Sequence, residues 1–501
     1  MKKIILISAF LFVTCALVAS PVGKERAFRV ASNAVTLICS EQQGVPLTEA
    51  VALTDVTSML DVDFLHVYNY HVDGIDGFIV ISGDDIASPV LAFSFEGAIS
   101  VESNPAFRDH LLAYSMQLRK GVETKSPAPA YVMHKWQQLE SGEALQNAAK
   151  GEYLNDNIPQ LLGDMVWGQG NPYNDRCPGG SVTGCVATAF GMIMNYWDYP
   201  EHGFGMHSYN GADNPAAYPD WTYGVQYADF EHTYYDWEHM ENSAYINSPS
   251  EVKQAISTLL YHIGVSLEMR YTPSGSGCWS LPEYAMFDTS LHLYERANVI
   301  GADYRIPRHF GYKYSYSGMR DSIGNDSIWL IMLYNSLAEG KPIYYAGWAS
   351  ANNEAGHSGT SGHGYIIDGY FSDPIDTNYF HINWGWNGSA DGFFKIDAMR
   401  PQGNDFTKWH GAIIGIEPDT TYHGYDYTGI RPTRIDDVIV YGGSGYLSVR
   451  NALDRRVAIF DLMGRQVFGN TVRDSEWKLA LRPGVYAVRV GAAPAKTIIV
   501  H

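Results

Sequence analysis

Apolar residues recur at helical spacing between positions 186 and 197. The apolar positions are Val186, Ala189, Phe190, Ile193, Met194 and Trp197. This spacing predicts an amphipathic helix, which Pro200 ends. Gly184 and Cys185 come directly before the run, and Thr183 is a suitable N-cap. We therefore expect a buried helix with Cys185 in its first turn.

A different pattern fills the range 344–416. Short apolar runs are separated by turn residues: PIYYAGW, GYIIDGYF, YFHINWGW, GFFKIDAM and GAIIGIEP. Such runs are typical of an antiparallel meander. The earlier part of the region 156–418 favours helices. The expected fold class is therefore α+β, a helical half followed by an antiparallel β half.

Two further regions flank this one. Residues 77–94 predict two strands around a Gly-Asp-Asp turn, and residues 105–122 predict an amphipathic helix, together a small mixed module. Residues 123–155 begin with Pro, Ala and Ser and end in polar residues, which is typical of an exposed, protease-accessible connection. Short β runs in residues 434–501 predict a small β-sandwich.

The first 20 residues, MKKIILISAFLFVTCALVAS, contain two lysines, then an apolar run, then small residues. This is the pattern of a secretory signal peptide, so we expect an exported protein. The chain has 501 residues, 46% of them hydrophobic, and a formal net charge of −20. The acidic balance argues against nucleic acid or an anionic membrane as a partner.

Four cysteines follow this leader, at positions 39, 177, 185 and 278. They are too few and too scattered for a disulfide scaffold. The sequence has neither a CxxC pair nor an HExxH motif, so we expect no metal and no cofactor. An exported free thiol is open to oxidation, and this cost favours a functional role for it.

Cys185 has two interpretations. The free N–H groups and the dipole at a helix start lower the pKa of a thiol and favour a reactive thiolate. A buried structural cysteine is the alternative. A thiolate nucleophile requires a base. His363 lies between two glycines at the start of a predicted strand, after a Gly/Ser/Asn-rich loop. A surface histidine is the alternative there, and His357 and His381 are weaker candidates.

Three more residues could complete an acyl-transfer site. Asn383 could hydrogen-bond to the imidazole, and Trp384 could shield that bond from water. A tight aromatic hairpin that only packs is the alternative. Gln169, in WGQGNPYN, could form a two-donor oxyanion hole with the Cys185 N–H, or could be an ordinary loop glutamine.

Five sequence motifs together closely resemble the streptopain family: QGNPYN, TGCVATA, IMNYWDYP, GHGYIIDGY and HINWGWNGSADGFF. This family, peptidase family C10, consists of papain-like bacterial cysteine proteases made as secreted zymogens. The resemblance implies that Cys185 is the nucleophile and His363 the base. It also implies that Gln169 supplies the oxyanion hole and that Asn383 and Trp384 line the histidine side.

The resemblance extends to the substrate site. It implies that Gly362 and Ser276, the latter in TPSGSGCWS, bind substrate, and that a hydrophobic residue is preferred two positions before the cleaved bond. One departure is Gly364 after the histidine, where alanine is frequent in the family. The expected partners are protein or peptide substrates and the chain's own propeptide.

The resemblance also divides the chain. Residues 1–20 would be the signal peptide, 21–152 an inhibitory propeptide, 153–418 the papain-like catalytic domain and 419–433 a linker. Residues 434–501 resemble the sorting domain of the type IX secretion system of Bacteroidetes, which would be a further partner. The expected location is outside the cell or on its outer surface, reached through the periplasm.

Two other functions remain open at this point. A secreted binding protein or adhesin on an inactive protease scaffold would use the aromatic-rich loops. Transpeptidation would use the same acyl-enzyme chemistry as hydrolysis.

Overall fold

The computed structural model describes most of the chain: residues 20–100, 104–125, 128–142, 157–210, 223–282, 300–348, 362–372, 376, 378–396, 410–422, 439–443, 446–450, 455–461, 464–473, 476–482, 484–491 and 496–500. Apart from Ser20, the predicted leader lies outside these residues. The chain divides into two compact units, Met1–Gly424 and Tyr425–His501. Among the described residues, no helix is long and apolar enough to cross a membrane.

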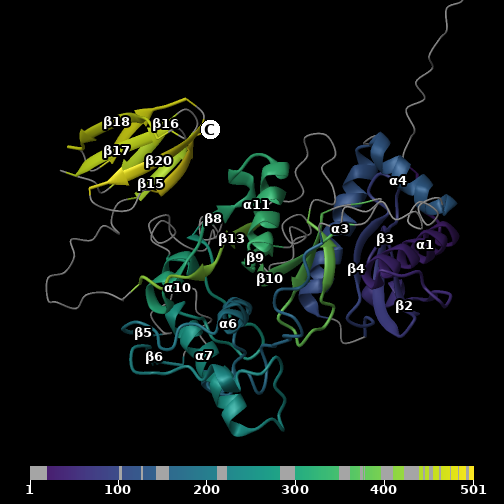
Figure 1. The fold of residues 1–501 in the computed structure, drawn as a ribbon, viewed down its shortest axis with the longest axis horizontal. Coiled ribbons are helices and arrows are strands. Elements are labelled where there is room, and N and C mark those ends of the chain that lie inside the picture. Colours follow the sequence, from purple (N-terminus) through teal and green to yellow (C-terminus); the bar gives the residue numbers. More distant parts are fainter. Residues whose placement is uncertain are drawn as a thin grey trace, which may run out of the picture. The chain divides into compact units, whose positions relative to one another are not determined.

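A ten-stranded antiparallel sheet runs through the first unit (Figure 1), in the order β1-β2-β3-β4-β12-β11-β10-β9-β13-β8. The strands are β1 (Ala52–Asp55), β2 (Leu65–Val72), β3 (Ile75–Ser82), β4 (Val90–Ser94), β8 (Tyr316–Met319), β9 (Ile343–Trp348), β10 (Gly362–Phe371), β11 (Tyr379–Asn383), β12 (Gly392–Lys395) and β13 (Gly411–Ile414). Smaller pairs are β5 (Met206–Asn210) with β6 (Val225–Asp229), and β7 (Tyr312–Lys313) with β14 (Glu417–Pro418).

The predicted meander is confirmed for four of its five runs. Strands β9, β10, β11 and β12 are consecutive neighbours, but β13 returns to the other side of β9. The physical reason is that β12 already has β11 on one side and β4 on the other. The free edge of β9 is therefore the place where the last run can complete its backbone hydrogen bonds.

Strand β4 joins the N-terminal region directly to the rest of the sheet. Phe93 pairs with Phe393 and Ala92 with Phe394, and the rings of Phe93 and Phe393 stack at 5.3 Å between centroids. The two strands predicted for residues 77–94 are present as β3 and β4. The N-terminal region is thus continuous with the sheet rather than a separate small module.

Helices cover both sides of the sheet (Figure 1). They are α1 (Lys24–Gln43), α2 (Thr57–Leu60), α3 (Pro105–Glu123), α4 (Ala130–Ser141), α6 (Cys185–Trp197), α7 (Ser250–Ser266), α10 (Ala302–Phe310) and α11 (Asp326–Ala338). Alternate strand residues face opposite ways. Tyr344 and Ile366 share one core with α6 and α7, whereas Tyr345 and Ile367 share another with α3 and α11.

Helix α4 corrects one prediction. The exposed connection expected over residues 123–155 contains this helix, in which Val132, Trp136 and Leu139 are buried. Trp136 is fully buried, and its indole N–H donates to the carbonyl of Ala87 at 2.8 Å. The apolar residues at helical spacing were hidden among Pro, Ala and polar neighbours, and their packing against the N-terminal region forms the helix.

The second unit contains two antiparallel sheets, β15-β16-β19 and β18-β17-β20-β21. These strands are β15 (Ile439–Gly443), β16 (Tyr446–Arg450), β17 (Arg456–Asp461), β18 (Gln466–Thr471), β19 (Glu476–Ala480), β20 (Gly484–Val490) and β21 (Lys496–Val500). Leu447 and Val449 of one sheet share a buried cluster with Val457 and Ile459 of the other. This arrangement is the small β-sandwich that the sequence predicts.

Candidate active site

Helix α6 begins at Cys185, and its N-cap is Gly184 rather than the predicted Thr183. Gly184 has φ 87°, and a Cβ on it would lie 2.8 Å from Met269 and 3.1 Å from the carbonyl oxygen of Ser276. This turn therefore requires glycine. The Thr183 hydroxyl instead bonds to that of Thr188 at 2.8 Å. Cys185 still stands in the first turn, as expected.

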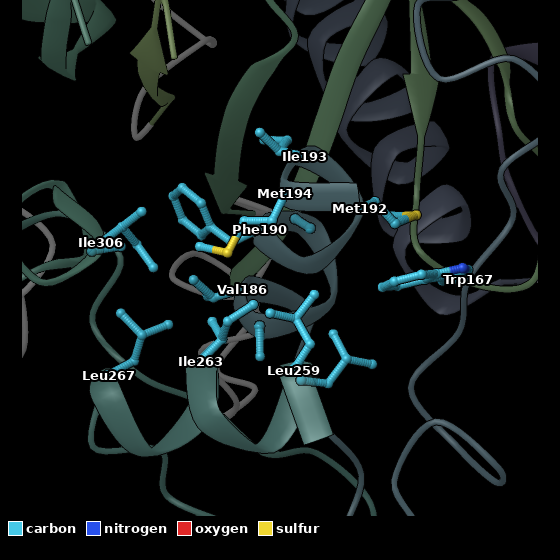
Figure 2. Packing of buried hydrophobic residues seen from close by; sticks show 14 of the residues in the cluster. Trp167, Val186, Phe190, Met192, Ile193, Met194, Leu259, Ile263, Leu267 and Ile306 are labelled. Atoms are coloured by element: carbon cyan, nitrogen blue, oxygen red, sulfur yellow. The ribbon is translucent and has the colours of Figure 1, made fainter. Parts of the chain in front are cut away.

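The body of α6 is held by close packing (Figure 2). Val186 lies against Leu259 and Ile263 of α7 in one buried cluster. On the sheet side, Phe190 stacks on Tyr344 with ring centroids 4.8 Å apart. A helix packed on both sides at crystal-like density has little freedom to shift, so the position of Cys185 is fixed.

Cys185 meets His363 at this helix start. His363 is the second residue of β10, and both side chains are partly exposed. The thiol and the imidazole are hydrogen-bonded to each other. The N–H of Gly364 also donates to the sulfur of Cys185 at 3.3 Å. The structure therefore brings together the two residues that the sequence analysis paired.

A main-chain carbonyl orients the imidazole. His363 Nε2 lies 2.9 Å from the oxygen of Trp384. A carbonyl oxygen can only accept, so Nε2 carries a proton. Nδ1 is then the ring nitrogen left for Cys185. This arrangement fixes the tautomer that a proton-accepting histidine needs.

The pKa values of this pair move toward each other. Burial raises the pKa of the Cys185 thiol, but the charge of His363 and hydrogen bonds from His363, Gly364 and Val186 outweigh it, so that this pKa lies below its ordinary value. Burial lowers the pKa of His363, but Cys185, the Trp384 carbonyl and the nearby Asp109 carboxylate raise it above its ordinary value. These shifts favour a thiolate beside an imidazolium.

The other described cysteines behave in the opposite way. Burial raises the pKa of Cys39 to about 11 and that of Cys177 to about 12. Burial and the nearby Cys185 also raise the pKa of Cys278. Cys185 is therefore the one cysteine in the described part of the chain whose surroundings favour the thiolate.

The expected contact between Asn383 and the imidazole is absent. The Asn383 amide nitrogen donates to the carbonyl of Met165 at 2.7 Å, and its oxygen accepts from the Gly385 N–H at 3.0 Å. Asn383 is buried. The physical reason is that the adjacent main-chain carbonyl already occupies the ring nitrogen. Asn383 therefore ties the segment that carries this carbonyl to the loop before α6.

Two tryptophan rings lie near His363. The side chain of Trp384 is buried, and its ring centroid lies 6.2 Å from that of His363. Its indole N–H donates to the Ala390 carbonyl at 3.0 Å, and its main-chain N–H donates to Asp391 at 2.9 Å. A second ring, Trp386, lies 6.4 Å from His363. Both rings therefore lie close to the histidine that bonds to the Trp384 carbonyl.

The remaining predicted residues surround the same turn. Gln169 accepts the Thr183 N–H at its main-chain oxygen at 3.0 Å, which places it beside the start of α6. The main chain of Ser276 abuts Gly184, while its hydroxyl bonds to the N–H and carbonyl of Thr272. Gly362 opens β10, is exposed and directly precedes His363.

Sequence reasoning missed several neighbours of the pair. The Gly364 N–H and the Trp384 carbonyl are main-chain groups, which leave no residue-type signal. Asp109 lies on α3, far away in sequence, and no local motif marks it. The adjacent His110 packs on Trp384 with ring centroids 5.4 Å apart. The N-terminal region therefore reaches the surroundings of His363 through α3.

Comparison with protein families gives two matches. Residues 167–394 match the Peptidase C10 family, and this range contains the Cys185–His363 pair. Residues 19–118 match the Spi protease inhibitor family, and this range contains α1, α3 in part and β1 to β4. An inhibitor-like domain therefore precedes the peptidase domain in this chain.

The chain is also similar to characterised proteins. It is 25% identical over 413 residues to streptopain of Streptococcus pyogenes, covering 77% of this chain and 90% of streptopain. It is 29% identical over 401 residues to the thiol protease/hemagglutinin PrtT of Porphyromonas gingivalis, covering 77% of this chain and 40% of PrtT.

A solved structure agrees with this. The prointerpain A fragment of Prevotella intermedia, a cysteine-to-alanine mutant, matches with a TM-score of 0.51 and 26% identity, covering 73% of this chain and 98% of the fragment. The expected papain-like α+β fold is thereby confirmed. The region 167–394 is a Peptidase C10 domain related to streptopain, and the chain is a cysteine peptidase.

Proposed function

We propose that this chain is the zymogen of a secreted cysteine endopeptidase in which Cys185 is the nucleophile and His363 the general acid and base. The observation that carries the proposal is the hydrogen-bonded Cys185–His363 pair at the start of α6, with the Trp384 carbonyl bonded to the opposite ring nitrogen at 2.9 Å. A nucleophile, a base and an orienting group in line are what acyl transfer through a thiolate requires.

In the first half-reaction, the Cys185 sulfur forms a bond to the carbonyl carbon of the scissile peptide, and the carbonyl electron pair moves to oxygen. The Cys185 N–H and the Gln169 amide stabilise this oxyanion. The position of Gln169 beside Thr183 supports its role. The carbon–nitrogen bond then breaks as the Nδ1 proton of His363 passes to the leaving amine.

In the second half-reaction, His363 Nδ1 accepts a proton from water while the water oxygen attacks the thioester carbon. The carbon–sulfur bond breaks, the acid product leaves, and the thiolate–imidazolium pair returns. If an amine replaced water, the same acyl-enzyme would give transpeptidation, which product analysis by mass spectrometry distinguishes from hydrolysis.

Gly362 and Ser276 form the substrate side of the proposed site, with a hydrophobic residue favoured at P2. The closeness of the Ser276 carbonyl to Gly184 and the position of the exposed Gly362 directly before His363 support this assignment. Asn383 positions His363 indirectly, because it holds the segment that carries the Trp384 carbonyl. The Trp384 side chain excludes water.

The same proposal covers maturation. Residues 21–152 act as an inhibitory prodomain and are removed from the catalytic domain at 153–418. Residues 1–20 direct export, and residues 434–501, after a linker at 419–433, serve type IX secretion to the cell exterior or outer surface. The match of residues 19–118 to a protease inhibitor family supports the prodomain.

Covalent labelling tests the proposed nucleophile. The processed protein is incubated with an irreversible thiol-protease inhibitor, and the modified cysteine is mapped by peptide mass spectrometry. We expect one adduct, on Cys185, and none in His363→Ala under the same conditions. An unlabelled Cys185 in processed protein would instead favour a binding protein on an inactive protease scaffold.

A further inference from the structure

Two buried charge clusters join the N-terminal region to the rest of the sheet, away from Cys185. The first is centred on His381 of β11. Its Nδ1 lies 2.5 Å from a carboxylate oxygen of Asp368 on β10, and its Nε2 lies 2.7 Å from Glu96, two residues after β4. Ionised carboxylates only accept hydrogen bonds, so both ring nitrogens carry protons and His381 is an imidazolium.

Two of the three side chains in this cluster are almost fully buried. The side chains of His381 and Asp368 are 3% and 1% exposed, and that of Glu96 is 29% exposed. Asp368 and His381 form a neutral pair within the peptidase domain. Glu96 adds one negative charge from the N-terminal region. Gln160 donates a further hydrogen bond to Glu96 at 2.6 Å.

The second cluster has the opposite sign. Asp376 accepts hydrogen bonds from Lys395 of β12 and, at 2.6 Å, from Lys135 of α4. The side chains of Asp376 and Lys395 are each 5% exposed. This is again a neutral pair within the peptidase domain, to which the N-terminal region adds one charge, in this case a positive one.

We propose that His381 and Asp376 are two charge receptors by which the catalytic domain selects its own prodomain. The partner that fits is a chain that adds a strand to β12, places a carboxylate at His381 and places an ammonium at Asp376. Here Glu96 and Lys135 supply these charges. The proposal rests on the proposed function only in treating the N-terminal region as a prodomain.

Main-chain pairing and buried charges contribute differently to the selection of a partner. Pairing between β4 and β12 uses main-chain groups, which give affinity but little selectivity. A wrong partner would leave a buried imidazolium or carboxylate without its second hydrogen bond, or would face it with a like charge, and both are costly. The two receptors differ in sign, so they also fix the orientation of the partner.

Hydrogen exchange of the full chain tests the proposal. All variants carry Cys185→Ala, so that the readout does not depend on proteolysis and survives a failure of the proposed function. We expect Glu96→Gln and Lys135→Met each to speed exchange of the β4 amides about tenfold or more. Exchange in α6 should stay unchanged. Lys24→Met and Glu49→Gln, on exposed side chains, are the matched controls.

Double-mutant cycles complete the test. Glu96→Gln should have little further effect in a His381→Gln background, and Lys135→Met little in an Asp376→Asn background. The second cycle serves if His381→Gln fails to fold. Equal exchange in Glu96→Gln, Lys135→Met and the controls would overturn the proposal. Equal acceleration in α6 or fully additive effects would do the same.

Discussion

The Nε2 atom of His363 lies 2.9 Å from the main-chain oxygen of Trp384, and this contact leaves Nδ1 for Cys185. The orienting group is part of the backbone, so no substitution removes it directly. The residues that matter for it are those that hold the segment 383–391 in place. Their effects on catalysis are therefore indirect.

Asn383→Ala should act in this indirect way. It removes the bonds to the Met165 carbonyl and the Gly385 N–H, and leaves buried groups without partners. We expect a loss of about 1–3 kcal/mol in the free energy of unfolding, measured by urea denaturation. The peptidase rate should fall, while the pKa of His363, measured by NMR in the Cys185→Ala chain, should shift little. A large shift would indicate a direct side-chain contact.

The reactivity of Cys185 should persist below the pH at which an ordinary thiol loses its thiolate. The lowered pKa of Cys185 means that the thiolate is present above this pKa and disappears as the pH falls through it. Iodoacetamide labelling, resolved for each cysteine by mass spectrometry, gives the profile. His363→Ala should move the Cys185 profile to higher pH, since it removes the stabilising charge. An unmoved profile would contradict the pairing.

Gly184→Ala should be more damaging than loss of a glycine that also has positive φ but open space around it. A Cβ there meets Met269 at 2.8 Å, in addition to the backbone strain at φ 87°. Gly205→Ala is the matched control, because Gly205 has φ 65° but open space around it. We expect a cost of about 1–2 kcal/mol for the control and a larger one for Gly184→Ala, measured by urea denaturation. Equal costs would show that the contact with Met269 is unimportant.

Acid should weaken the contact between Glu96 and His381, but neutral pH should not. Burial raises the pKa of Glu96, but His381 and Gln160 lower it below its ordinary value overall, so its contribution is lost as the pH falls through this value. Burial lowers the pKa of His381, but Glu96 and Asp368 raise it well above its ordinary value, so neutral pH leaves it charged. Asp391, whose pKa is raised by burial and by Glu96, also faces the cluster.

The effect of Glu96→Gln on β4 hydrogen exchange, corrected for intrinsic rates, should thus be constant from roughly pH 5 to 8 and vanish in stronger acid. Lys135→Met provides the comparison for the second cluster. Burial raises the pKa of Asp376, but Lys395 and Lys135 lower it below its ordinary value overall. A loss of the Glu96→Gln effect near neutral pH would contradict these directions.

Local patterns predicted much of this molecule. The spacing from Val186 to Trp197 predicted α6, and the short apolar runs of residues 344–416 predicted β9 to β13. In both cases the pattern of apolar positions is complete within the element itself. Helix α4 was missed because only Val132, Trp136 and Leu139 carry its pattern. Its formation depends on packing against distant segments.

Long-range relationships were beyond local patterns. The pairing of β4 with β12 joins Phe93 to Phe393, and no periodicity identifies a partner strand so far along the chain. The pairing of Cys185 with His363 came from chemical requirements and family resemblance. The role of orienting the imidazole was assigned to the Asn383 side chain and not to the Trp384 carbonyl. A sequence identifies side chains but carries no direct information on main-chain geometry.

The most direct test of the central claim compares two single cysteine variants of the full-length protein after processing. Cys185→Ala should abolish peptide hydrolysis, because it removes the thiolate that pairs with His363. Cys278→Ala should retain hydrolysis, because the raised pKa of that thiol keeps it neutral. To separate folding from chemistry, the processed form of both variants is prepared by adding active wild-type protein and then purified away from it. Residual hydrolysis by pure Cys185→Ala at a rate near that of the wild type would contradict the account.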